Sequence, residues 1–508
     1  MTELPPAKDR PSRHWQSPLL LSHDLPTRPR PEVGRVLVTG ASGYIGGRLV
    51  PELLARGYRV RVMVRASSPE YAQRWPGAEI AVADALDLEK LREALRDVRV
   101  AYYLIHSLSR GPKRFEATDI QAATNFRKAA VANGLDHVIY LGGLGDARGR
   151  LSDHLRSRME VANALQAKAV RATVLRAAII IGSGSASYEI IEHLVKRCPV
   201  ILMPKLANNK CQPIAIRDVI KFLVGVLETP ETAGKTFDIG GNEVFSYREM
   251  MEILADLLRK RRLFLTIPLS YTALYAYLTS LYTPVPGPII RCLMEGLRND
   301  VVCQDNAIRR YLPVQTISYR EALVRAMSRE EQDAVHTRWS DAYPPAHELA
   351  LKLDELEETP RHTASYSLVT EKSADALFRS ICRIGGKRGW FHSNWLWRLR
   401  GALDRLLMGV GASRGRRSHS ELKINDVIDF WRVEDLRPSE RLLLRAEMKL
   451  PGRAWLEFAI GRAGNGSRLS VRPYYETRTL WGKLYWYSVL PLHHFIFTRL
   501  LEHIERQS

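Results

Sequence analysis

The stretch TGASGYIG, residues 39–46, decides the fold of this chain. Its glycines, Gly40, Gly43 and Gly46, stand three residues apart between a strand-like run, RVLVTG, and a helical pattern. The first glycine permits a tight turn, the second lets the backbone approach a pyrophosphate, and the third allows close packing of helix on strand. The helix N-terminus then offers unpaired N–H groups to an anion. The pattern predicts a dinucleotide-binding turn rather than a purely structural glycine turn.

Strand-like runs alternate with helical patterns from residue 35 to about residue 182. This alternation is typical of a parallel, doubly wound sheet, the α/β Rossmann architecture. The regularity weakens after residue 183, where we expect a small substrate-side lobe. The predicted nucleotide-binding domain spans residues 32–330.

The end of the second predicted strand bears on the choice of nucleotide. A carboxylate about 20 residues after the glycines would bind the ribose 2′-OH of NAD. Arg65 stands there instead, followed by Ser67 and Ser68. Because Arg can clasp a 2′-phosphate, NADP is favoured over NAD. The alternative is a solvated arginine at a strand end.

Composition divides the rest of the chain. Residues 1–31 hold seven prolines and predict a disordered tail, and the polar residues 331–364 predict a linker. Residues 365–508 carry seven of the ten tryptophans, in runs that alternate as antiparallel strands before an apolar C-terminal helix over 485–505. We expect an α+β domain of helix-grip type, a curved sheet that holds the helix around an apolar cavity.

Charge and cysteine content limit the partners. The net charge of +20 favours anionic partners: a phosphorylated cofactor, an acidic membrane surface or nucleic acid. Nucleic acid is not expected, because the tryptophans fall within apolar strands rather than along a basic groove. No metal is expected either, since His493 and His494 have no Cys or carboxylate at ligand spacing. Five cysteines without a C-x-x-C pair indicate a reducing, cytoplasmic location.

One apolar segment is long enough to be compared with a transmembrane helix. The basic run RKRR, residues 259–262, precedes twenty mostly apolar residues, 263–282. Pro268 interrupts the segment, and nine of its residues are Ser, Thr or Tyr, so a lid with peripheral membrane contact is favoured over a true span. The oligomeric state is left open by the sequence.

These motifs resemble a known family. VTGASGYIGG, Arg65, VAD (82–84), SDHLRSR and LRAAIIIGSGSASYE are similar to the atypical short-chain dehydrogenase/reductases of the NmrA-like group, over about residues 35–330. The part from residue 365 resembles an uncharacterised domain fused behind such dehydrogenase domains, with a pattern similar to START-like proteins, which enclose apolar ligands.

The resemblance implies roles for individual residues. The glycines would hold the pyrophosphate, residues beside them would line it, Arg65 would meet the 2′-phosphate, and Asp84 would reach the adenine. Two residues after the fourth strand would border the nicotinamide. The implied cofactor-binding set is Gly40, Ser42, Gly43, Tyr44, Ile45, Gly46, Arg65, Asp84, His106 and Ser107.

The sequence also departs from the family. Active members of the wider superfamily have a Ser after the fifth strand and Tyr-x-x-x-Lys on the next helix. Gly142 and Gly143 replace the Ser here, while His154 aligns with the Tyr and Arg158 with the Lys. His154 is the candidate acid or base, because the free imidazole titrates near neutral pH. Arg158 is the candidate ribose holder.

Three functional hypotheses remain. The first is an NADP-dependent oxidoreductase or isomerase with a non-standard site, the oxidoreductase acting on a small apolar carbonyl or quinone-type substrate. The second is a catalytically silent, cofactor-binding sensor or scaffold. The third is a lipid-binding protein that works through its C-terminal domain.

Overall fold

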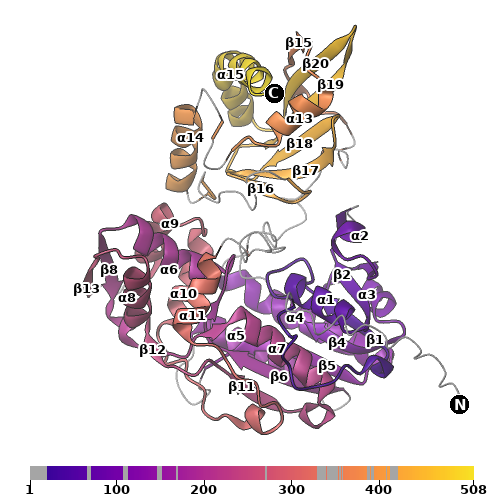
Figure 1. Cartoon of the computed structure of the whole chain (residues 1–508), viewed down its shortest axis with the longest axis vertical. Helices are drawn as coiled ribbons and strands as arrows, with labels where there is room; N and C mark the ends of the chain where they lie inside the picture. The colour runs from indigo at the N-terminus through magenta and orange to yellow at the C-terminus, as the bar shows by residue number, and fades with distance from the viewer. Residues whose placement is uncertain are drawn as a thin grey trace, which may run out of the picture.

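The chain folds into two domains joined in sequence by a long connection (Figure 1). The computed structural model describes residues 20–65, 70–106, 112–145, 152–166, 170–268, 272–328, 339, 353, 356, 358–385, 389–390, 394–407, 409–411 and 422–508. Most of the predicted linker, 331–364, therefore lies outside the described residues.

The N-terminal domain is built on a seven-stranded parallel sheet with the order β11-β6-β5-β4-β1-β2-β3. The strands are β1 (Arg35–Thr39), β2 (Arg59–Val64), β3 (Glu79–Val82), β4 (Val98–Tyr103), β5 (His137–Gly143), β6 (Arg171–Ala177) and β11 (Thr236–Ile239). The strand order reverses between β1 and β4, where doubly wound sheets bind ligands outside the carboxyl ends of their strands. The predicted parallel α/β sheet is confirmed.

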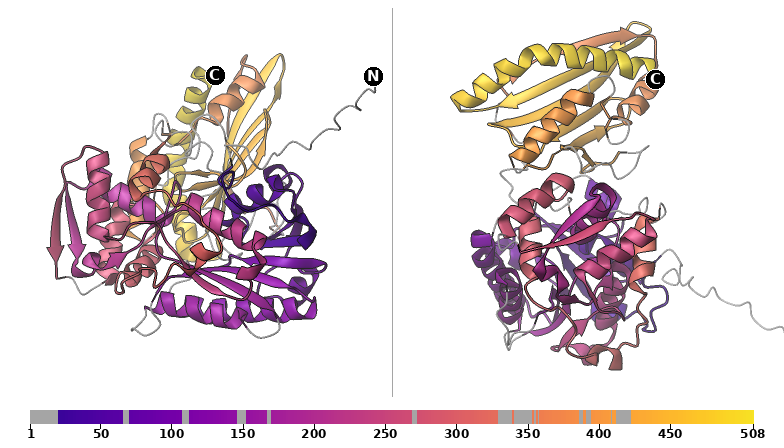
Figure 2. Two further views of the ribbon diagram at one scale, coloured as in Figure 1. Left: turned by 60° about the horizontal axis from the view of Figure 1, so that its bottom comes forward. Right: turned by 90° about the vertical axis from the view of Figure 1, so that its left-hand side faces the viewer.

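Helices cover both faces of this sheet (Figures 1 and 2). One apolar core includes residues of α1 (Gly46–Ala55) and α7 (Ile216–Glu228). The core on the other face includes residues of α3 (Leu88–Ala94), α4 (Pro112–Ala132) and α5 (Asp153–Leu165). The short helix α2 (Glu70–Arg74) precedes β3. This layered packing leaves the carboxyl ends of the strands as the open edge of the domain.

A smaller lobe with its own core follows β6. Its helices are α6 (Ala186–Arg197), α8 (Tyr247–Leu257), α9 (Thr272–Tyr282), α10 (Gly287–Gly296) and α11 (Tyr319–Met327). Three two-stranded pairs complete it: β7 (Ile180–Ile181) with β10 (Ile214–Ala215), β9 (Lys210–Cys211) with β12 (Phe245–Ser246), and β8 (Val200–Pro204) with β13 (Leu263–Ile267).

The apolar segment 263–282 is divided between a strand and a helix. Residues 263–267 form β13, which pairs in parallel with β8, and residues 272–282 form α9. Among the described residues, the helices are all too short or too polar to cross a bilayer.

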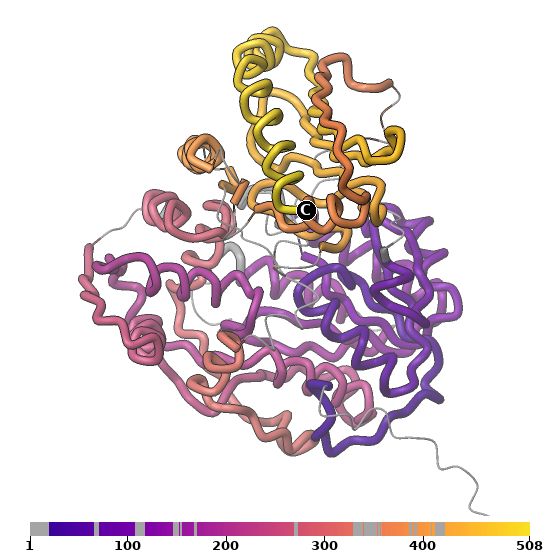
Figure 3. The backbone as a smooth tube through the Cα atoms, turned by 45° about the horizontal axis from the view of Figure 1, so that its top comes forward, coloured from indigo at the N-terminus to yellow at the C-terminus, as the bar shows by residue number. Residues whose placement is uncertain are grey.

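The C-terminal domain is an antiparallel sheet with a long helix against it (Figures 2 and 3). Its strands are β14 (His362–Thr363), β15 (Tyr366–Thr370), β16 (Val427–Ile428), β17 (Trp431–Arg437), β18 (Arg441–Ala446), β19 (Arg453–Ala463) and β20 (Gly466–Glu476). Its helices are α13 (Ala374–Ile381), α14 (Asn394–Leu406) and α15 (Leu480–Arg506). The predicted α+β class is confirmed, whereas a ligand cavity of helix-grip type stays a prediction.

The ends of the two domains differ from the expected boundaries. β14 lies within the predicted linker and pairs with β20, so the C-terminal domain begins before residue 365. The linker boundary was wrong because a two-residue edge strand carries almost no periodic signal.

Residues 20–31 were expected to belong to a disordered tail, and this was wrong. The Leu21 and Ser22 N–H groups donate to the Glu52 carboxylate of α1, at 2.7 and 3.0 Å, and Asp24 pairs with Lys221 of α7 at 2.7 Å. Leu25 is buried in the core. Local composition could not reveal these contacts, because every partner is distant in sequence.

A buried ion pair anchors this segment. Arg56 Nη2 lies 2.6 Å from Glu228 Oε2, and both side chains are fully buried. The same guanidinium donates to the carbonyl oxygens of Ser22 and Thr27, at 3.3 and 3.1 Å. One arginine thus joins the N-terminal segment, α1 and the end of α7.

Removing one member of this pair should destabilise the N-terminal domain. In Glu228→Leu the buried guanidinium loses its counter-charge, and breaking such a pair costs about 3–5 kcal/mol. Urea unfolding followed by circular dichroism measures the loss. Asp256→Asn is the matched control, because the Arg320–Asp256 pair is mostly exposed and should be worth less than about 1 kcal/mol. Equal losses in the two variants would contradict the assignment.

Candidate functional site at the carboxyl ends of the strands

The glycine turn between β1 and α1 is closed by contacts that admit no side chain. Gly40 has a φ of 63°, and a Cβ there would stand 2.7 Å from the Leu104 carbonyl oxygen. A Cβ on Gly46 would stand 2.4 Å from the Gly40 carbonyl oxygen. Gly43 donates its N–H to the same oxygen at 3.0 Å. Both ends of the turn therefore require glycine.

The N-terminus of α1 has the properties of an anion site. Ile45 occupies the N-cap position and supplies no side-chain hydrogen bond. The N–H groups of Gly47 and Arg48 already donate to the Gly43 and Ile45 carbonyl oxygens, at 3.0 and 3.1 Å, so this end offers a phosphate chiefly the positive end of the helix dipole. Ser42 and Tyr44 flank the turn half-buried, while Ile45 packs against the core beneath it. These residues fit the pyrophosphate of a dinucleotide.

The other predicted cofactor residues lie after neighbouring strands. Arg65 follows β2 and is exposed, and His106 follows β4 and is also exposed. Asp84 follows β3, where its carboxylate accepts the Leu86 N–H at 2.9 Å. The fold therefore brings them to one edge of the sheet. Ser107 lies outside the described residues, and the nucleotide contacts of all these side chains stay predictions.

The helix after β5 carries the two catalytic candidates. α5 begins after Ser152, whose hydroxyl accepts the Leu155 N–H at 3.3 Å, so His154 falls in the first turn. The His154 side chain is outside the described part of the chain. Arg158 stands one turn further along, and its Nη1 donates to the Tyr140 hydroxyl of β5 at 3.4 Å.

Arg158 belongs to a polar group beneath the crevice. Burial by itself would lower the pKa of Arg158, but Tyr140 and Asp119 outweigh it and raise that pKa. Tyr140 in turn donates its hydroxyl to the Arg158 carbonyl oxygen at 3.3 Å, and burial raises the pKa of Tyr140. Arg158 is therefore a permanent cation beside the end of β5. Its role in binding a ribose stays a prediction.

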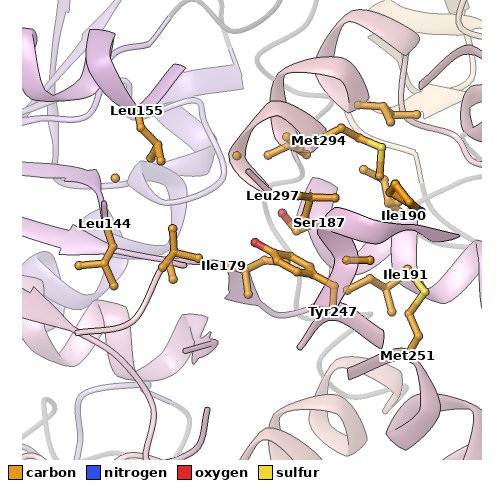
Figure 4. A pocket seen from close by; sticks show the side chains of 18 of the residues that line it. Leu144, Leu155, Ile179, Ser187, Ile190, Ile191, Tyr247, Met251, Met294 and Leu297 are labelled. Atoms are coloured by element: carbon orange, nitrogen blue, oxygen red, sulfur yellow. The ribbon is translucent and has the colours of Figure 1, made fainter. Parts of the chain in front are cut away.

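An apolar pocket of about 150 Å³ opens beside this group. One wall comes from the ends of β5 and β6 and from α5; the other comes from the lobe (Figure 4). The lining residues are Gly143, Leu144, Leu155, Ala177, Ala178, Ile179, Ser187, Ile190, Ile191, Met203, Pro204, Ala207, Tyr247, Met251, Tyr275, Ile290, Leu293, Met294, Gly296, Leu297 and Val301. It lies at the carboxyl ends of β5 and β6, and doubly wound folds bind their ligands outside the carboxyl ends of the strands.

Few polar groups reach the pocket. Ser187 and Tyr247 turn their oxygen atoms towards the space between the walls (Figure 4). Burial, with the Cys211 thiol beside it, raises the pKa of Tyr247 well above its usual range. Burial likewise raises the pKa of Tyr275 to about 12. The Tyr275 hydroxyl already donates to the Leu202 carbonyl oxygen, so Tyr247 is the tyrosine whose hydroxyl is directed into the pocket (Figure 4).

Sequence reasoning missed this pocket. It identified the lobe, but none of the lobe residues that line the cavity. The lining residues run from Gly143 to Val301 and are mostly aliphatic, so each one reads locally as ordinary core. Only the tertiary packing distinguishes them.

Two family models match the chain. Residues 32–274 match the NmrA-like family, and residues 358–500 match a family described as a protein of unknown function, DUF2867. The predicted resemblance to NmrA-like proteins is thus confirmed for the first of these ranges. The START-like character of the second stays a prediction.

Individual relatives are distant. The chain is 25% identical over 288 residues to NADH dehydrogenase [ubiquinone] 1 alpha subcomplex subunit 9, mitochondrial, of Arabidopsis thaliana, covering 54% of this chain and 71% of that protein. It is 26% identical over 251 residues to divinyl chlorophyllide a 8-vinyl-reductase, chloroplastic, of Zea mays, covering 46% of this chain and 62% of that one. A triphenylmethane reductase of Citrobacter sp., solved with NADP(H), is 18% identical with a TM-score of 0.47, covering 58% of this chain and all of that chain (100%).

Filling the glycine turn should weaken nucleotide binding. In Gly46→Ala the new methyl group would clash with the Gly40 carbonyl oxygen, so α1 must move away from β1. This movement would displace the helix N-terminus from the position in which it can bind a phosphate. We expect NADPH affinity to fall by at least about tenfold, as measured by isothermal titration calorimetry. Gly461→Ala is the control, because a Cβ there meets nothing within 4 Å. Unchanged NADPH binding by a folded Gly46→Ala protein would refute the site.

Proposed function

We propose that the chain is an NADP(H)-dependent oxidoreductase that acts on an apolar carbonyl or quinone-type substrate. The observation that carries the proposal is the apolar pocket at the same strand ends as the glycine turn. A substrate in this pocket would lie beside the end of β5, next to the crevice where the nicotinamide of a bound dinucleotide is expected. The match of residues 32–274 to the NmrA-like family supports the cofactor class.

The chain's own residues would bind the substrate, exclude water and supply a proton. A bound nicotinamide supplies or accepts a hydride. Aliphatic side chains such as Leu155 and Met294 would hold the apolar body of the substrate and keep water out. Tyr247 and Ser187 would orient a substrate oxygen by hydrogen bonding. His154 is the candidate that delivers the proton to that oxygen, because it lies one residue before Leu155 on α5.

Arg158 would act on this reaction through charge. Its guanidinium lies beside β5, where a Cβ on Gly143 would be 3.7 Å from Arg158 Cγ. A permanent cation there disfavours a protonated imidazole nearby and attracts a ribose or phosphate oxygen. Arg158 is therefore a candidate for binding cofactor.

A silent cofactor-binding protein is the second candidate, and three observations favour it. Gly142 and Gly143 stand where the wider superfamily has its Ser, and the Arg158 guanidinium is already engaged with Tyr140. One relative is named as a subunit of a complex rather than as a reductase. In this alternative the nucleotide stabilises the fold and no turnover follows.

Arg65 should select NADPH over NADH. Losing one charge-assisted contact to the 2′-phosphate costs about 1.5–3 kcal/mol. We therefore expect Arg65→Ala to weaken NADPH binding by that amount and to leave NADH binding unchanged, in titrations followed by nucleotide fluorescence. Arg59→Ala at the opposite end of β2 is a matched control, because its exposed position is remote from the carboxyl ends of the strands. Equal wild-type affinity for the two nucleotides would contradict the assignment.

The oxidoreductase should turn over a substrate that binds in the apolar pocket, whereas the silent cofactor-binding protein should show no turnover. NADPH oxidation is screened against quinones and apolar carbonyls, and the active compound is then tested on Ala178→Phe. Filling a cavity of about 150 Å³ should lower kcat/KM by at least about tenfold with NADPH affinity retained. Val324→Phe, at an exposed position of α11, is the control. His154→Ala, made separately, should remove most of the wild-type activity because general acid catalysis is lost.

Three outcomes separate the possibilities. Activity that survives Ala178→Phe shows that the substrate binds elsewhere. Activity that survives His154→Ala removes that residue from proton transfer. NADPH binding without turnover of any compound in the screen supports the silent candidate instead.

A further inference from the structure

A row of exposed apolar side chains runs along α14. Trp395, Leu399, Leu403 and Leu406 lie at spacings of four, four and three residues and therefore share one face of the helix. Their exposed fractions are 63%, 50%, 49% and 57%. The opposite face meets the domain core through Trp397, which stacks on Trp390 with ring centroids 4.6 Å apart. α14 is thus an amphipathic helix with a second, unburied apolar face.

The neighbouring helix α9 has the same property. Leu274, Leu278 and Tyr282 recur every four residues and are 41–49% exposed, although residues 272–282 contain no charged side chain at all. The two helices meet across the domain boundary. Tyr277 Oη donates to the Leu406 carbonyl oxygen at 3.4 Å, and Arg405 of α14 donates to the Leu281 carbonyl oxygen of α9.

The β8–β13 pair adds a third apolar surface to the same side of the molecule. Val200 pairs with Leu263 and Leu202 with Leu265, and these four side chains are 43–55% exposed on one face of the pair. β8, β13, α9 and α14 all lie on the left of Figure 1, and this side faces the viewer in the right-hand view of Figure 2. Apolar surface of this extent on one side marks an interaction site rather than scattered exposure.

The charges around this surface are cationic. Residues 259–262, RKRR, enter β13 directly, and Arg259, Lys260 and Arg261 are exposed. On α14, Arg398 is exposed, while Asp404, the helix's one acidic residue, is fully buried. An apolar surface with a cationic rim matches the acyl boundary and the anionic headgroups of a bilayer.

Two arginines from different domains converge at the centre of this surface. Arg197 of α6 donates to the Tyr282 carbonyl oxygen at 3.1 Å, one residue from the carbonyl that accepts from Arg405. Burial, and after it the charge of Arg197, lowers the pKa of Arg405 to about 10. A phosphate placed between the domains would relieve this repulsion.

We infer that the face formed by α9, α14 and the β8–β13 pair docks on an anionic lipid bilayer. The Trp395 row would enter the headgroup boundary, and the cations of 259–262 and α14 would meet lipid phosphates. α9 also contributes Tyr275 to the wall of the apolar pocket. One face of this helix would therefore contact the membrane, and the other lines the pocket. If the proposed oxidoreductase function holds, an apolar substrate would have a short route from the bilayer.

Vesicle flotation of the full-length protein tests the inference without any assay of activity. Binding is expected to vesicles of equimolar phosphatidylcholine and phosphatidylglycerol, to be weak on pure phosphatidylcholine, and to decrease at high salt. The triple variant Trp395→Ser, Leu399→Ser, Leu403→Ser should bind the anionic vesicles at least about tenfold more weakly. Arg398→Glu with Lys260→Glu should weaken binding while leaving the apolar face intact.

The matched control is Val131→Ser, Val324→Ser, Val369→Ser, which removes three exposed apolar side chains from other parts of the surface. It should bind vesicles as the wild type does. Absence of vesicle binding by the wild type, or equal loss in both triple variants, overturns the inference. A concentration-dependent dimer in size-exclusion chromatography that only the Trp395 triple variant dissociates, without vesicle binding, would assign the face to a second copy of the chain. NADPH binding and turnover are measured separately, so their failure leaves this test unaffected.

Discussion

The close approach of Gly46 to the Gly40 carbonyl, where a Cβ would be 2.4 Å away, fixes α1 against the end of β1. Thr39 ties that strand to β4 across the switch point, accepting the Leu104 N–H at 3.1 Å and donating to the Tyr102 carbonyl oxygen at 3.0 Å. α1 then carries Glu52 and Arg56, which bind the segment 20–31 and Glu228. The close packing of Gly46 that shapes the anion site and the buried Arg56–Glu228 ion pair therefore lie at opposite ends of the same helix, α1.

The parts of the structure that sequence could predict are those with a local physical cause. The glycine turn follows from steric rules and the strand–helix alternation from hydrophobic periodicity, and both act within a few residues. The ordered segment 20–31 and the apolar pocket have no such cause. Arg56 and Glu228 are 172 residues apart, and nothing near Ser22 indicates that it would meet Glu52.

The two glycines at the end of β5, Gly142 and Gly143, are closely packed. A Cβ on Gly143 would be 3.0 Å from Leu155 Cδ2, and a Cβ on Gly142 would be 3.0 Å from the Tyr140 ring. A serine at either position would therefore require Leu155 or Tyr140 to move. Since Leu155 lines the pocket and Tyr140 binds Arg158, the glycines, the apolar wall and the cation form one connected arrangement. A single substitution back to Ser would disturb the pocket before it supplied a hydroxyl.

α9 connects features that could otherwise be treated separately. Tyr275 faces the pocket, Leu274 and Leu278 face outward, and the end of the helix receives arginines from α6 and α14. Cations at a helix C-terminus are favourable because the last carbonyl groups carry partial negative charge. Here those cations belong to different domains, so the same interaction that caps α9 holds the C-terminal domain to the lobe that follows β6. Any change that displaces α14 from this helix end would therefore alter the pocket wall and the exposed apolar face together.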